Sequence, residues 1–151
     1  MTKEQALAQM KVTVLGLEYN VIPNQVNLID GVKIDADHRI SISVLVRVVQ
    51  KQEIDDKLYL FLAKKEPNNS CRMFHVAEIY LNPSKHSEEG IYDPPIVNAG
   101  RLPADEYHLR QNCRYNLADI PDIDVGTYAI VVSTAKNDVD NILDVYYFEA
   151  E

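Results

Sequence analysis

The chain has 151 residues, of which 46% are hydrophobic and 25% are charged, and its formal net charge at pH 7 is −8. Because about 150 residues is the commonest size of one compact domain, and because this mixture is too hydrophobic for a disordered tail and too polar for a membrane protein, we expect residues 1–151 to form a single soluble domain. The surplus of negative charge repels phosphate backbones and anionic lipids, so neither nucleic acid nor a membrane is an expected partner.

The first residues predict a short helix followed by a strand. Thr2 and Gln5 have the spacing of a capping box, which favours an amphipathic helix over residues 3–10. This segment lacks the apolar core of a secretion signal, and we expect a cytoplasmic protein. In the strand that follows, the apolar alternation from Val12 breaks at Gly16, which predicts a β-bulge there.

The middle of the chain contains the clearest strands. Asp30-Gly31 has the chemistry of a two-residue turn and predicts a short hairpin over residues 26–34. Apolar and polar residues then alternate from Ile40 to Val48, as in a half-buried strand. Between Leu58 and Ala63 both faces are apolar, which predicts a central strand or one at an interface between copies of the chain. Residues 71–81 form another extended run.

Residues 82–123 differ from the rest because they hold five of the seven prolines. Proline interrupts strands, so this Pro/Tyr segment is expected to consist of loops and short edge pieces. Beyond it, alternation predicts two strands, near residues 128–132 and 143–147, joined by a long loop. Seven or eight short strands indicate an all-β antiparallel sandwich or barrel, and we favour the sandwich.

The segment Asp124-Val-Gly126-Thr-Tyr128-Ala-Ile130 resembles the Asp-x-Gly-x-Tyr-x-Cys signature of immunoglobulin-like domains. The resemblance implies an immunoglobulin-like β-sandwich in which Tyr128 is a corner tyrosine, with its hydroxyl bonded to backbone a few residues upstream. Asp124 and Gly126 complete this structural corner. The chain has no Trp, Ile130 replaces the signature cysteine, and neither cysteine falls where the disulfide of an antibody-type domain lies.

Acidic turns are expected to gather at both ends of such a sandwich. Ca²⁺ takes six to eight oxygen ligands, which paired loops can supply. Asp also dominates ordinary solvated turns for local backbone reasons, and this is the simpler interpretation. The candidate metal ligands are Asp35, Asp37, Asp122 and Asp124 at one end and Asp55, Asp56, Asp138 and Asp140 at the other.

Surface recognition is the other candidate activity. Tyrosine offers a large contact area at low entropic cost, and loops on a rigid sandwich commonly carry binding. Equally, such tyrosines could cover the core and leave their hydroxyls in water. The candidate binding residues flank or lie within the Pro/Tyr segment and are Tyr80, Tyr92, Tyr107 and Tyr115.

No catalytic motif is present in the sequence. The four histidines lack the spacing of a helical zinc site, and there is no glycine-rich phosphate loop. An enzyme would have to be assembled from distant residues such as His75, His108 or Cys113. The leading hypothesis is therefore a non-enzymatic protein-interaction or assembly module without a cofactor, which binds another protein or itself. The alternative is a Ca²⁺-dependent ligand-binding sandwich that uses the acidic loops.

Overall fold

The computed structural model describes residues 2–20, 25–51, 54–68, 70–81, 91–92, 96–97, 109–134 and 141–151. These residues form one short helix, seven strands of eight to twelve residues and three strands of two residues. In chain order the elements are α1 (Lys3–Gln9), β1 (Lys11–Glu18), β2 (Gly31–Val32), β3 (Ile40–Gln50), β4 (Lys57–Lys65), β5 (Cys71–Tyr80), β6 (Ile91–Tyr92), β7 (Ile96–Val97), β8 (Leu109–Ile120), β9 (Gly126–Ser133) and β10 (Ile142–Ala150).

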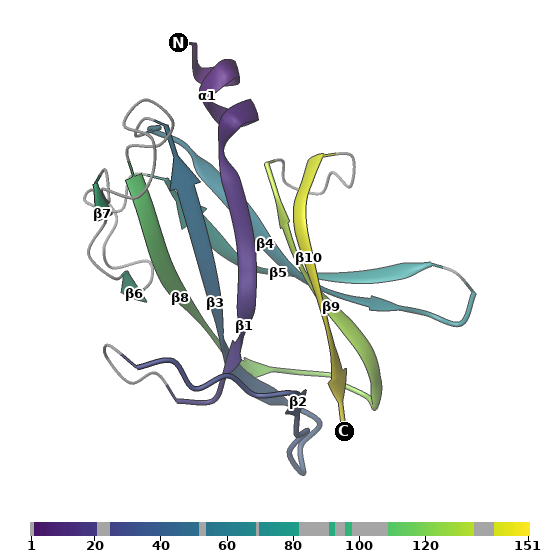
Figure 1. The fold of residues 1–151 in the computed structure, drawn as a ribbon. Coiled ribbons are helices and arrows are strands. Elements are labelled where there is room, and N and C mark those ends of the chain that lie inside the picture. The colour runs from purple at the N-terminus through teal and green to yellow at the C-terminus, as the bar shows by residue number, and fades with distance from the viewer. Residues whose placement is uncertain are drawn as a thin grey trace.

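Helix α1 starts where its capping residues predict. The Thr2 side chain accepts a hydrogen bond from the Gln5 backbone N–H, and the Gln5 side chain accepts one from the Thr2 N–H. The capping box is therefore present, and the helix ends at Gln9. Ala6 of the helix and Met10, its C-cap residue, are buried in the core, and the chain continues directly into β1 (Figure 1). No helix in the described parts of the chain has the length and apolar character needed to cross a membrane.

The strands form two sheets that face each other (Figure 1). The first sheet has the order β1-β3-β8-β6, with β7 also paired to β8, and the second sheet has the order β2-β10-β9-β4-β5. The first sheet thus has the A-B-E-D order of immunoglobulin-like sandwiches, and β4-β9-β10 has their C-F-G order. The predicted all-β sandwich is confirmed. It is not purely antiparallel, because β2 runs parallel to β10.

The main core lies between the two sheets and is built by alternation along the strands. On β3, Val44 and Val46 are fully buried, and on β4 the same holds for Leu60 and Leu62. Strand β4 lies between β9 and β5, so the prediction of a central strand at residues 58–63 is confirmed. The predicted final hairpin is also present, because β9 and β10 pair antiparallel.

The hairpin predicted for residues 26–34 is wrong. The backbone N–H of Ile29 donates to the carbonyl of Leu17 in the first sheet, over 2.8 Å, and the chain then joins the second sheet as β2 beside β10. Residues 25–30, which we call the crossover segment, therefore link the two sheets. Asp30-Gly31 has suitable turn chemistry, but turn chemistry does not identify the partner of the strand that follows.

The expectation that residues 82–123 are loops and short edge pieces is wrong for β8. This twelve-residue strand is the longest one described, and it pairs with β3 along nearly its whole length. Pro103 and Pro121 flank the strand without interrupting it. The short strands β6 and β7 are edge pieces of the expected kind.

Candidate functional site

The corner residues lie as the resemblance implies. The hydroxyl of Tyr128 donates to the carbonyl of Asp124 over 2.9 Å and accepts a hydrogen bond from the backbone N–H of the same residue over 3.0 Å. The tyrosine ring is buried and stacks on Phe148 with centroids 5.8 Å apart. Gly126 has a φ of +154°, which favours glycine. These contacts fix the entry of the chain into β9 and are structural.

Two acidic loops meet at one end of the sandwich, as expected. The backbone N–H of Ile123 donates to the carbonyl of His38 over 2.9 Å. The carboxylate of Asp35 is engaged within its own loop, because its Oδ1 accepts the backbone N–H groups of Asp37 and Arg39 over 2.8 and 2.9 Å. This is the local role that aspartate commonly takes in turns.

Asp122 and Asp124 contribute backbone groups to that end of the sandwich. The carbonyl of Asp122 accepts a hydrogen bond from Arg72 over 2.8 Å, and that of Asp124 accepts the Tyr128 hydroxyl. The Asp122 backbone has a φ of +59°, a conformation that aspartate tolerates in turns. Both residues thus have a structural role here through their main chains.

At the other end, Asp55 and Asp56 precede β4. Oδ1 of Asp56 accepts the backbone N–H of Lys57 over 2.8 Å. Asp138 and Asp140, which were expected beside them, lie outside the described residues. Within the part of the chain that the structure describes, no group of three or more His, Cys, Asp or Glu residues is arranged to hold a metal ion.

The four candidate tyrosines do not form one site. Tyr115 is 2% exposed because it lies on the core-facing side of β8, so the prediction that it contacts a partner is wrong. Tyr80 is half-buried at the end of β5, and its hydroxyl donates to Glu78 over 3.1 Å. Tyr92 belongs to β6, but its side chain and all of Tyr107 lie outside the described residues.

A buried ion pair within the first sheet also holds the crossover segment. Nε of Arg114 donates to Oε1 of Glu18 over 3.0 Å, and the two side chains are 3% and 0% exposed. Oε2 of Glu18 accepts the backbone N–H of Asn27, while Nη2 of Arg114 donates to the carbonyl of Gln25. The contacts with Asn27 and Gln25 hold the crossover segment against the first sheet, and the pair therefore has a structural role.

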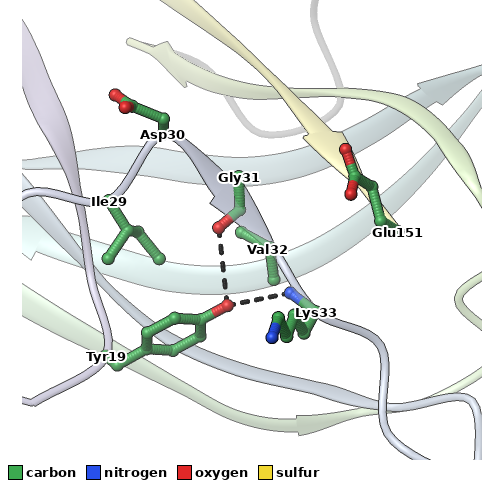
Figure 2. Close-up of a pocket in the computed structure, with 7 residues that line it drawn as sticks. All are labelled: Tyr19, Ile29, Asp30, Gly31, Val32, Lys33 and Glu151. Carbon is green, nitrogen blue, oxygen red and sulfur yellow. Dashed lines mark hydrogen bonds between the residues drawn. The ribbon is translucent and has the colours of Figure 1, made fainter.

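A shallow pocket of about 390 Å³ lies where the crossover segment enters the second sheet. Figure 2 shows that the Tyr19 hydroxyl lies between two backbone groups: it donates to the carbonyl of Gly31 and accepts the N–H of Lys33 over 2.8 Å. The carboxylates of Asp30 and Glu151 do not converge on that hydroxyl (Figure 2). The hydrogen bonds of Tyr19 hold β2 in place. The pocket presents no cluster of reactive side chains.

The second sheet carries an additional apolar cluster on the side that faces away from the first sheet, which we call the outer face. Phe61 and Ala63 of β4 alternate with core residues and are only 1% and 5% exposed. In the neighbouring strand they pair with Val131 and Ala129, and Val131 in turn pairs with Val145 of β10. The cluster therefore runs across three strands.

A hollow of about 580 Å³ lies beside this cluster. It is lined largely by apolar side chains, which include Ala63, Ala129, Val131, Ile142, Val145 and Tyr147. Tyr147 is 70% exposed and Ile142 is 42% exposed. Cys71, a free and exposed thiol, also borders the hollow. The outer face thus combines buried and exposed apolar side chains around one concavity.

Charged side chains of the outer face lie at its rim. Nζ of Lys57 contacts Oε1 of Glu78 over 3.1 Å, and this hydrogen bond raises the pKa of Lys57 above its usual range. Toward the opposite end of the face, the Thr127 hydroxyl donates to Glu149, and Lys65 borders the hollow. Charges of both signs therefore surround an apolar centre.

One signal in the sequence indicated this face. The apolar alternation on both sides of residues 58–63 predicted a strand with two buried sides, and Phe61 and Ala63 are its outer residues. The contribution of β9 and β10 depends on their pairing with β4, which sequence periodicity does not give. An interface between copies at this strand remains a prediction.

No protein-family model matches the sequence, and no curated protein matches it either. A β-glucosidase from Listeria innocua in complex with isofagomine is similar in structure with a TM-score of 0.48 and 11% identity, over 93% of this chain and 16% of that one. An immunoglobulin-like protein from Pseudomonas aeruginosa has a TM-score of 0.42 and 15% identity, over 95% of this chain and 99% of its own. An alkylpurine DNA glycosylase from Pseudomonas fluorescens, bound to DNA containing an abasic site analogue, has a TM-score of 0.43 and 14% identity, over 95% and 30%.

Proposed function

We propose that the chain is a non-enzymatic protein-binding module and that the outer face of the second sheet is its binding surface. The observation that supports this most strongly is the apolar cluster and hollow on a sheet face that points away from the core. The outer face of an antiparallel sheet ordinarily carries polar side chains that contact water. An exposed apolar patch with a polar rim is typical of a protein-interaction surface, and on this face Tyr147 and Ile142 are exposed beside the hollow.

The arrangement of side chains matches the usual composition of such surfaces. Aromatic and aliphatic residues form the cluster and line the hollow, among them Tyr59 and the strongly exposed Tyr147. Charged groups, such as the Lys57–Glu78 pair, stand at the rim. Protein interfaces combine an apolar, aromatic centre with a polar rim, and exposed tyrosines often provide much of the binding energy.

The same features favour a protein over other classes of partner. An apolar centre without a basic patch offers nothing to a phosphate backbone or an anionic membrane, and the net charge of −8 opposes both. The function proposed requires no cofactor. We place the binding surface on the second sheet rather than on the Pro/Tyr segment, because the apolar cluster and the hollow that support the proposal are formed by residues of that sheet.

Substitution of Tyr147 tests the proposal. Tyr147→Glu puts a charge beside the hollow of the outer face, and Val26→Glu is the matched control, because Val26 is 54% exposed on the crossover segment. Tagged versions would be recovered from the source cells and the bound proteins quantified by mass spectrometry. We expect partners that are retained by the wild type and the control but lost with Tyr147→Glu. Identical recovery by all three would refute the proposal.

A further inference from the structure

We propose that the partner of the outer face is a second copy of this chain, so that two second sheets pack face to face about a two-fold axis. The inference rests on the proposed function, because it uses the same surface. The charge and the shape of the outer face support the inference, and its area limits the strength of the contact. These properties are taken from the described residues of β4, β5, β9 and β10 that point away from the first sheet.

The charge of the face suits a second copy. The chain as a whole carries −8, so two copies repel each other through most of their surfaces. On the outer face, by contrast, Lys57 and Lys65 balance Glu78 and Glu149. Two outer faces can therefore meet without concentrating negative charge. A strongly acidic or basic partner would find no matching charge there.

The shape of the face is self-complementary. Tyr147 projects from the face with 70% of its surface exposed, and the hollow that it borders lies on the same face. A two-fold interface brings the same patch of both copies together, so a projection on one copy can enter the concavity of the other. A projecting tyrosine beside an apolar hollow of about 580 Å³ provides both halves of such a contact.

The area of the outer face limits the strength of such a dimer. Strands β4, β5, β9 and β10 have nine, ten, eight and nine residues. Strands lie about 4.8 Å apart and rise about 3.3 Å per residue, which gives a flat area of roughly 500–600 Å². Part of this area is already buried within the single chain, because Phe61 and Ala63 are 1% and 5% exposed and Ala129 and Val131 are each 9% exposed. A standard interface buries about 800 Å² on each partner. The contact between two copies would therefore be smaller than a standard interface and would be made by exposed side chains such as Tyr147 and Ile142.

The edges of the second sheet are less suitable for self-association. Strand β5 forms one edge, and its register with β4 shifts between the partners of Leu60 and Phe61. Such a bulge disrupts the regular row of backbone groups that edge-to-edge pairing needs. The other edge, β2, has only two residues. Within the second sheet, the outer face is consequently the surface that the second copy would use.

The mass of the full chain in solution tests the inference. Light scattering after size exclusion, and sedimentation velocity, would be recorded from about 1 to about 200 µM, a range suited to modest interfaces. We expect the wild type to have twice the monomer mass of 17.2 kDa at the upper concentrations. Tyr147→Glu and Ile142→Glu should each weaken the dimer by at least about thirty-fold, whereas Val26→Glu should change it by less than about three-fold.

Thermal unfolding shows that each variant is folded, and all three side chains are exposed enough for the substitutions to be tolerated. A monomer at every concentration, or equal weakening by all three substitutions, would overturn the inference. The wild type could be monomeric while another protein is recovered with the wild type but not with Tyr147→Glu. In that case the proposed function stands, and only the inference that the partner is a second copy is wrong. If recovery is also insensitive to Tyr147→Glu, both fail.

Discussion

The guanidinium of Arg114 and the carboxylate of Glu18 form an ion pair that is almost completely removed from solvent, with Nε and Oε1 3.0 Å apart. The two residues are 96 positions apart in the chain and belong to β8 and β1, the strands on either side of β3. Each also binds the backbone of the crossover segment. The pair therefore fixes where the chain leaves the first sheet for the second.

Loss of one partner of this pair should be strongly destabilising. Glu18→Ala removes a buried carboxylate that contacts the Arg114 guanidinium, so we expect the free energy of unfolding to fall by about 3–5 kcal/mol. Urea denaturation at pH 7 measures it. The control is Glu66→Ala, which removes a partly exposed ion pair with Arg72 and should cost less than about 1 kcal/mol. Similar losses in the two variants would contradict the structural role of the buried pair.

Features specified by neighbouring residues were predictable from the sequence. The capping box at Thr2, the bulge at Gly16 and the corner at Tyr128 each depend on groups only a few residues apart, and all three are present. Alternation likewise identified β3 and β4, because the period of a strand is visible in one segment. Local signals thus gave the sandwich and most of its strands.

Features specified by distant residues were not predictable. The partner of β2 is β10, and nothing within residues 26–34 indicates it. The burial of Tyr115 follows from the pairing of β8 with β3, which brings it opposite Val44 in the core. For the candidate site, one strand of the outer face was visible in the sequence. Its width was not, because that depends on which strands lie beside β4.

The corner tyrosine offers a test of a single hydroxyl. Tyr128→Phe keeps the buried ring but removes both hydrogen bonds to the Asp124 backbone, so we expect a loss of about 1–3 kcal/mol in the free energy of unfolding. Tyr19→Phe is a matched control, because that hydroxyl also bonds two backbone groups but at an exposed position. Urea denaturation should show a smaller loss of the free energy of unfolding for Tyr19→Phe than for Tyr128→Phe. The reverse order would mean that the Tyr128 hydroxyl does not stabilise the protein more than the Tyr19 hydroxyl.

Calcium should not stabilise the protein through Asp35. Its Oδ1 already accepts two backbone N–H groups, and the described residues contain no group of three or more candidate ligands. We therefore expect that Asp35→Asn leaves the effect of Ca²⁺, added up to about 1 mM, on the melting temperature unchanged. A rise of several degrees would support the calcium alternative. Asp35→Asn and Asp55→Asn would then show which end of the sandwich holds the ion.

Gly16 and Leu28 should be coupled in stability. Gly16 has a φ of +153°, and a Cβ added there would lie 2.8 Å from Cδ2 of Leu28 on the crossover segment. Gly16→Ala therefore combines backbone strain with a steric clash, and we expect it to cost about 1–3 kcal/mol. Leu28→Ala removes the clash but leaves the strain, so the double variant should lose less stability than the sum of the two single variants, by at least about 0.5 kcal/mol. Urea denaturation of all four proteins gives this difference directly. Additive losses would mean that the crossover segment moves aside freely and that backbone strain alone accounts for the effect of Gly16→Ala.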